Sequence, residues 1–176
     1  GLQGNIGPNN VAACAKHFVG SGEAFNGING SEIDISERTL ESIHFPPFRK
    51  AVDADVLSIM PAHHAINGVP CHTHRQYLCE RLSEQWGFNG IVVSDWMDIG
   101  RLHSSQRVAA SFSEACEISI NAGVDMYMAG DGFFDAMASS VHSGAVSESR
   151  IDEAAGRILR TKFRLGLFDT DIEHAS

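Results

Sequence analysis

Several familiar sequence patterns are missing from this chain, and each absence argues against one class of protein or one kind of site. No apolar run is long enough to span a bilayer, and no secretory signal peptide stands at Gly1. No glycine fingerprint for a dinucleotide follows any expected strand, which argues against a Rossmann fold. No CxxC pair occurs among Cys14, Cys71, Cys79 and Cys116, so we expect buried free thiols, with Cys14 in a strand and Cys116 in a helix.

Positive charge is also scarce. The 176 residues carry 13 Lys and Arg against 22 Asp and Glu, a formal net charge of -9, which argues against nucleic acid and anionic membranes as partners. Hydrophobic residues make up 43% and charged residues 20%, as in an ordinary globular domain. The chain begins without Met in a polar stretch, residues 1–10, so we expect it to start inside a longer protein.

The stretch Gly90–Trp96 holds the clearest signal. Ile91, Val92 and Val93 predict a strand buried on both faces, and Ser94-Asp95-Trp96 follows directly. Asp95 could simply cap the next helix. A carboxylate beside an indole at a strand end also suits a sugar, because the indole packs on the C–H face of the ring while the carboxylate attacks or stabilises the anomeric carbon.

Strand and helix patterns alternate four times, which predicts an α/β fold with a parallel sheet. Polar groups end three strands, at Lys16-His17, His63-His64 and Ser94-Asp95-Trp96. A (β/α)8 barrel brings such groups to one face but needs about 250 residues and eight βα units, so four units predict half a barrel. The expected strands are residues 11–18, 56–60, 91–93 and 124–129, and the expected helices are residues 36–43, 47–52 (after a break at Pro46-Pro47), 73–86, 108–119, 133–141 and 147–163.

Seven short motifs occur together in a characteristic order, and with them the chain resembles the catalytic barrel of glycoside hydrolase family 3, in its β-glucosidase and exo-β-glucanase branch. The resemblance covers about residues 11–168. It implies that residues 1–176 are the second half of the N-terminal (β/α)8 barrel domain. The motifs are Lys16-His17-Phe18, Ser36-Glu37-Arg38-Thr39-Leu40, Pro46-Pro47-Phe48, Asn67-Gly68-Val69-Pro70, Trp86-Gly87-Phe88-Asn89-Gly90 with Val93-Ser94-Asp95-Trp96, Arg150-Ile151-Asp152 and Gly166-Leu167-Phe168.

The resemblance also implies the chemistry. Asp95 would be the nucleophile of a retaining β-glycoside hydrolase that acts on terminal, non-reducing β-linked sugars, with no cofactor and no metal. Lys16 beside Asp95 would keep that carboxylate ionised. Substrate-binding residues implied by the resemblance are Lys16, His17, Met60, His63 and Trp96.

Two departures from the family pattern stand out. His63 and His64 occupy positions where the family usually has Tyr-Asn; an imidazole charges near pH 6.5, so a His-like pH dependence of activity is expected. The general acid is also missing: Glu23 lies on a suitable loop, but nothing favours it. The resemblance therefore implies a fragment that does not hydrolyse glycosides alone and that pairs with the other barrel half and a C-terminal domain, or with itself.

Two rival interpretations remain open. His63, His64, His72 and His74 could bind Zn²⁺ in a metal-dependent hydrolase, although adjacent His residues on an extended segment point to opposite sides. A half-barrel with exposed edges could instead be a non-catalytic, sugar-binding or assembly piece. The sugar, glucose or xylose, is not determined by these residues. The compartment also stays open, although the resemblance favours an exported protein.

Overall fold

The computed structural model describes residues 3, 6 and 10–169, so most of the polar stretch 1–10 lies outside the described residues. The strands are β1 Cys14–Phe18, β2 Ser58–Pro61, β3 Ala65–Ile66, β4 Val69–Pro70 and β5 Ile91–Val92. The helices are α1 Glu37–Thr39, α2 Phe45–Asp53, α3 Asp98–Ser104, α4 Phe112–Ala122, α5 Phe133–Ser143 and α6 Glu148–Arg164. Two π-helical stretches, η3 Leu40–His44 and η5 Gln76–Gln85, and three 3-10 turns, η1 Ser21–Glu23, η2 Phe25–Gly27 and η4 Cys71–Thr73, complete the fold.

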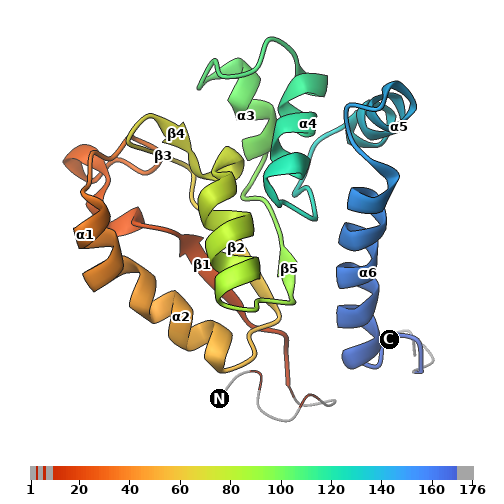
Figure 1. The fold of residues 1–176 in the computed structure, drawn as a ribbon, viewed down its shortest axis with the longest axis horizontal. Coiled ribbons are helices and arrows are strands. Elements are labelled where there is room, and N and C mark those ends of the chain that lie inside the picture. Colours follow the sequence, from red (N-terminus) through yellow and green to blue (C-terminus); the bar gives the residue numbers. More distant parts are fainter. Residues whose placement is uncertain (1–2, 4–5, 7–9, 170–176) are drawn as a thin grey trace, which may run out of the picture.

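The expected parallel sheet is present. Its order is β1-β2-β5, with Cys14 paired with Ser58 and Ser58 paired with Ile91. In Figure 1 these strands occupy the centre of the molecule, with α1 and α2 on one side and α6 on the other. Since all three strands are parallel, their carboxyl ends meet at one edge of the sheet.

The prediction of a fourth strand over residues 124–129 is wrong about its length. Only a single parallel bridge, between Val93 and Met126, continues the sheet. Beyond it, the amide of Met128 donates to the Ser94 hydroxyl and the amide of Met97 donates to the Met128 carbonyl. Residues 127–129 therefore lie beside the loop that follows β5. That loop is not extended, so it cannot form the strand pairing that a longer fourth strand would need.

The break expected at Pro46-Pro47 is also wrong. The Ser36 side chain caps the helix as predicted, but helical backbone continues through α1, η3 and α2. The amide of Phe45 bonds the Leu40 carbonyl, five residues earlier, which widens this turn. Pro46 and Pro47 then fall in the first turn of α2, where a missing N–H costs little.

One helix was missed and another is shifted. The sequence predicts one helix over 108–119, whereas the structure has α3 before it and α4 starting at Phe112. α3 ends at Ser104, and Arg107, in the connection after it, has a φ of 58° that is incompatible with a helix starting near residue 108. The Ser111 hydroxyl accepts the Glu114 amide to start α4. Cys14 is exposed on β1, which corrects the expectation of a buried thiol, while Cys116 is buried as expected.

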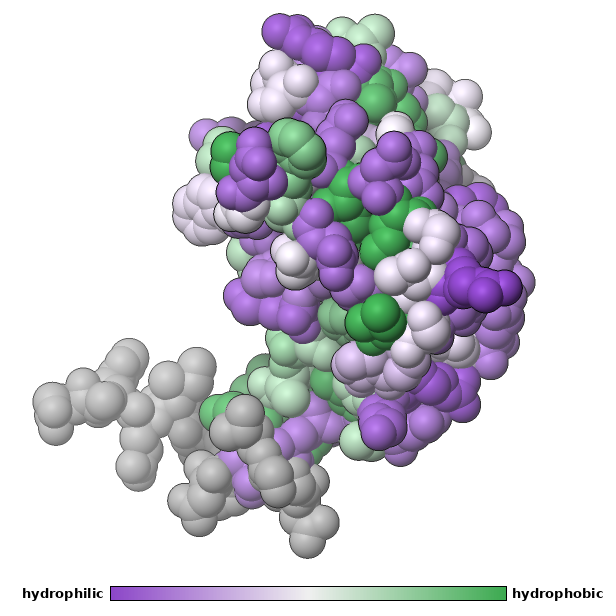
Figure 2. Space-filling model, turned by 90° about the vertical axis from the view of Figure 1, so that its left-hand side faces the viewer, coloured by the Kyte–Doolittle hydropathy of each residue, from purple (hydrophilic) through white to green (hydrophobic). Residues whose placement is uncertain are grey.

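Aromatic packing joins the helices to the sheet. The Phe45 ring contacts those of Phe18, Tyr77 and Trp86, with ring centroids 6.0, 5.2 and 5.7 Å apart. These contacts hold α2 and η5 against the end of β1, close to His17. Figure 2 shows a largely hydrophilic face crossed by apolar residues, and none of the helices in the described part combines the length and apolarity needed to cross a membrane.

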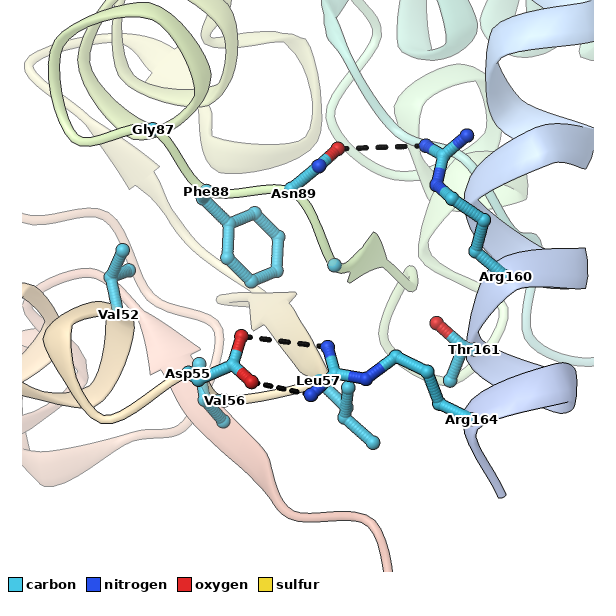
Figure 3. Close-up of a pocket in the computed structure, with 11 residues that line it drawn as sticks. Val52, Asp55, Val56, Leu57, Gly87, Phe88, Asn89, Arg160, Thr161 and Arg164 are labelled. Atoms are coloured by element: carbon cyan, nitrogen blue, oxygen red, sulfur yellow. Dashed lines mark hydrogen bonds and ion pairs between the residues drawn. The ribbon is translucent and has the colours of Figure 1, made fainter. Parts of the chain in front are cut away.

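A buried ion pair ties α6 to the sheet. The Asp125 side chain is 0% exposed; its Oδ1 lies 2.7 Å from Arg150 Nη2, and its Oδ2 accepts the Val92 amide at 2.9 Å. An exposed ion pair, Asp55 with Arg164, lies at the opposite end of the strands, beside a cavity of about 210 Å³ (Figure 3). The two pairs offer a matched comparison.

We expect Asp125→Asn to lower the free energy of unfolding by about 3 kcal/mol, because it removes the buried carboxylate that pairs with Arg150 and Arg157 and leaves Arg150 only the Glu153 carboxylate, at 3.5 Å. Asp55→Asn removes an exposed pair and should cost less than about 1 kcal/mol. Asn also tolerates the left-handed backbone at this position, where φ is 59°. Urea unfolding measures both, and equal losses in the two variants would contradict this assignment.

Candidate active site

Asp95 lies at the carboxyl edge of the sheet, 7% exposed, in a loop fixed by backbone bonds. Val93 donates its amide to Ile59 on β2, and Ser94 donates its own to Met126. The amide of Asp95 donates to His72 Nε2 at 3.0 Å. Asp95 does not cap α3, since the residue before that helix is Met97, in left-handed conformation. Its position is therefore rigid and its carboxylate is free for another role.

The two carboxylate oxygens of Asp95 have different surroundings. Oδ1 accepts the amide of Trp96 at 2.7 Å. Oδ2 is buried and has no hydrogen-bond partner among the described residues. Two imidazole nitrogens lie near it, His17 Nε2 at 3.4 Å and His63 Nε2 at 3.2 Å, but neither is aligned for a hydrogen bond. One oxygen is thus satisfied and the other is left available.

A second buried carboxylate, Asp98, stands behind His63. It is 2% exposed, and its Oδ2 lies 2.7 Å from His63 Nδ1 and 3.6 Å from His72 Nδ1. Burial raises the pKa of Asp98, although its hydrogen bond with His63 opposes that shift. Burial also lowers the pKa of His72 to about 3. A neutral His72 that accepts the Asp95 amide at Nε2 carries its proton on Nδ1, facing Asp98.

Asp98 and His72 were missed by sequence reasoning. Asp98 opens α3, and an acidic residue in the first turn of a helix is usually explained by the helix dipole. His72 was noticed only as one of four nearby His residues. The Asn67-Gly68 turn could have pointed to His72, because it predicts a hairpin directly before this residue. In the structure that hairpin is β3–β4, and both turn residues have positive φ. That hairpin returns the chain to the sheet edge.

The other predicted site residues also lie at the carboxyl edge of the sheet, but they differ in burial and in their distance from Asp95. Lys16 is exposed and pairs in register with Met60, which is 6% exposed within the core. The expected ion pair between Lys16 and Asp95 is absent among the described residues, and His17 takes that place. The register of β1 on β2 shifts between Lys16 and Phe18, so the strict alternation of a regular strand does not apply to Lys16 and His17. Trp96 is 61% exposed, with its ring available at the rim.

The four His residues considered as a zinc site do not converge. His64 Nε2 bonds the Val19 carbonyl at 2.9 Å, and the His74 ring stacks on Tyr77 with centroids 3.6 Å apart. His72 and His63 face the two carboxylates instead. Adjacent His63 and His64 point to different partners, as predicted. The set that does gather is His63, Asp95 and Asp98, whose possible ligand atoms lie within 4.8 Å of one another.

Comparison with known proteins decides the family. The model of the glycosyl hydrolase family 3 N-terminal domain matches residues 1–161. The chain belongs to glycosyl hydrolase family 3. This confirms the family resemblance drawn from the motifs.

Individual family 3 relatives agree. A β-xylosidase from Formosa agariphila is 40% identical over 181 residues, covering 96% of this chain and 25% of the relative. The periplasmic β-glucosidase of Salmonella typhimurium is 31% identical and covers 93% of this chain and 21% of the relative. A solved β-glucosidase from Erythrobacter marinus superposes with a TM-score of 0.91 at 38% identity, over 96% of this chain and 23% of that one. The chain thus spans about a quarter of the length of these relatives.

The buried His72 predicts how stability changes with pH. Its pKa in the folded chain, about 3, lies below the value of about 6.5 of an unfolded His, so only the unfolded chain binds this proton between those values. The free energy of unfolding should therefore fall by about 2 kcal/mol from pH 7 to pH 5 through His72. Urea unfolding of a His72→Gln variant should show a shallower pH slope. A slope unchanged by His72→Gln but altered by the exposed His142→Gln would contradict this.

Proposed function

We propose that this chain carries the nucleophile of a retaining β-glycosidase, and that the nucleophile is Asp95. The observation that supports this most is the asymmetry of its carboxylate, in which Oδ1 accepts the Trp96 amide while the buried Oδ2 lacks a hydrogen bond. An oxygen without a donor retains the electron density needed to attack an anomeric carbon. Membership of family 3 and relatives named β-xylosidase and β-glucosidase support the same reaction class.

The reaction proceeds in two steps. Asp95 Oδ2 attacks the anomeric carbon, the bond to the leaving group breaks, and a glycosyl ester forms. Water then attacks the same carbon and releases the carboxylate. The rigid loop that holds Asp95 positions this oxygen before the sugar binds, so orientation is not left to the substrate.

The neighbouring side chains supply the sugar site in this proposal. Lys16 and His17 donate hydrogen bonds to sugar hydroxyls, and the exposed ring of Trp96 packs on the apolar face of a ring beside the scissile bond. His63 stands beside the nucleophile, and Met60 lines the floor from β2. A terminal β-linked glucose or xylose is the expected substrate.

The general acid comes from outside this cluster. Retaining enzymes place their two catalytic carboxyl groups about 5–5.5 Å apart, on opposite sides of the bond that breaks. Asp98 is 2% exposed and faces His63, so it cannot reach a leaving group. Glu23 forms an ion pair with His44 on η3. Neither carboxylate is assigned as the acid, and in this proposal another part of the complete protein provides it.

We further propose that residues 1–176 are half of a (β/α)8 barrel domain. The parallel sheet supports this, as does the chain's span of about a quarter of its relatives. Other parts of a longer protein would then complete the barrel and the sugar site, with self-association of this chain as the alternative. The activity belongs to that complete assembly.

Covalent trapping tests the nucleophile. We expect an activated 2-deoxy-2-fluoro-β-glucoside, or the matching xyloside, to label the protein on Asp95. The fluorine slows both formation and hydrolysis of the glycosyl ester, and the activated leaving group restores the rate of formation alone, so the ester accumulates. Peptide mass mapping on the longest available form of the protein locates the label. Asp95→Asn should abolish the adduct, and a label on any other carboxylate would overturn the assignment.

The exposed ring of Trp96 leads to a separate prediction. Trp96→Ala should lower kcat/KM of the complete enzyme by about tenfold or more, since stacking on a sugar contributes on the order of 1–3 kcal/mol. Phe163→Ala is the matched control, an aromatic ring 62% exposed on α6 at the other end of the strands. Steady-state kinetics with an aryl β-glycoside compare them, and equal losses would argue against a sugar contact at Trp96.

A further inference from the structure

An apolar groove lies between α5 and α6, outside the active site. Its volume is about 450 Å³. Six apolar side chains of the two helices line it: Phe134, Ala138 and Val141 on α5, and Ile151, Ala155 and Ile158 on α6. None of the six is buried, and Phe134, at 82%, is the most exposed large apolar side chain in the described part of the chain. The groove is therefore open to solvent.

The spacing of these six residues is typical of a helix surface that faces a core. On both helices the three apolar residues follow one another by four and then three positions. A helix places residues with this spacing on one side, and that side normally packs against another element of the fold. Here both apolar sides border the same open groove. A contiguous exposed apolar surface of this kind marks a site of interaction.

The lining of the groove argues against a small polar ligand. Among the described residues that line it, only Asp125 is polar, and both of its carboxylate oxygens already have partners. Oδ1 lies 2.7 Å from Arg150 Nη2, and Oδ2 accepts the Val92 amide at 2.9 Å. Small-molecule sites usually add a few polar groups that orient the ligand. The groove instead suits the apolar side chains of another protein segment.

Backbone chemistry favours a helix over a strand as that segment. The two walls of the groove are helices, so their backbone groups bond within α5 and within α6. A strand placed in the groove would leave its N–H and C=O groups without partners in an apolar setting, which is costly. A helix satisfies its own backbone groups, and its side chains can pack between those of α5 and α6.

Acidic residues border the groove. Asp135 and Asp152 directly follow two of the groove residues, Phe134 and Ile151, and both carboxylates are exposed. One step along a helix turns by about 100°, so these side chains stand beside the apolar stripe rather than within it. Opposite charges across an interface steer association and fix its register. A matching helix therefore has an apolar stripe flanked by Lys or Arg.

The longer protein supplies further segments that could form this helix, since the chain spans about a quarter of the length of its relatives. In Figure 1, α5 and α6 lie on the right-hand side of the molecule, beyond β5, so an added helix would extend that outer layer. We propose that the groove between α5 and α6 binds an amphipathic helix, with Lys or Arg beside its apolar stripe, from another part of the same longer protein. This rests on the proposal that residues 1–176 are half of a barrel domain, and not on the role of Asp95.

Photo-cross-linking in the complete protein identifies the occupant. The variant Phe134→p-benzoylphenylalanine keeps an aromatic side chain at the most exposed position of the groove. We expect irradiation to join it, within one polypeptide, to a segment outside residues 1–176 that reads as an amphipathic, basic helix. The same probe at Ser139, which is exposed on α5 and does not line the groove, should not form this cross-link.

A matched pair of cysteine variants measures how well the groove is covered. In the complete protein, maleimide should label Ala138→Cys at least about tenfold more slowly than Ser139→Cys, because a covered side chain reacts only when the interface opens. Peptide mapping separates both sites from the exposed Cys14. If the cross-linking variant has lost its fold by circular dichroism, this pair decides.

Equal labelling of the two cysteine variants would overturn the proposal. A cross-link confined to residues 1–176, or one to a second copy of the protein, would overturn it as well. Trapping of a fluorosugar on Asp95 tests the nucleophile separately. A label together with an uncovered groove refutes only the docking site, and a covered groove without a label refutes only the glycosidase.

Discussion

One buried oxygen organises this end of the molecule. Asp95 is held by its amide to His72 and by its Oδ1 to the Trp96 amide, so its side chain has little freedom. Oδ2 then faces two imidazoles without a hydrogen bond. Whatever approaches this site meets a fixed negative oxygen in a largely desolvated setting. An electrophilic sugar carbon satisfies it, and the proposed role of Asp95 as nucleophile follows from that single unsatisfied atom.

Contacts at the carboxyl ends of the strands, and just before them, keep this oxygen in place. At the carboxyl edge, Ser94 exchanges bonds with residues 126–128, which carries the loop across to the next segment. Asp125 accepts the amide of Val92, the last residue of β5, and pairs with Arg150 on α6. This pair therefore ties α6 to the strand that leads directly into the Asp95 loop. In Figure 1, α3 and α4 lie at the opposite end of the molecule from the two chain termini. The site thus depends on contacts far apart in sequence.

The sequence predicted the features that depend on neighbouring residues along the chain. It did not predict those that depend on contacts between distant segments. The strand before Asp95 and the Asn67-Gly68 turn follow from residue types alone, and both are confirmed. The motifs led to family 3, which the comparisons confirm. Asp98 was missed because its role depends on contact with His63, 35 residues away. The helix through Pro46 and the truncated fourth strand depend on a π turn and on loop pairing, which periodicity does not reveal.

The most direct test is a crystal structure of the complete protein with a trapped 2-fluoroglycosyl group. It asks which oxygen carries the sugar, a question that mass mapping cannot answer. Our account predicts an ester through Asp95 Oδ2, with Oδ1 still accepting the Trp96 amide and His17 and His63 beside the ester oxygen. A sugar bonded through Oδ1, or through Asp98, would contradict it.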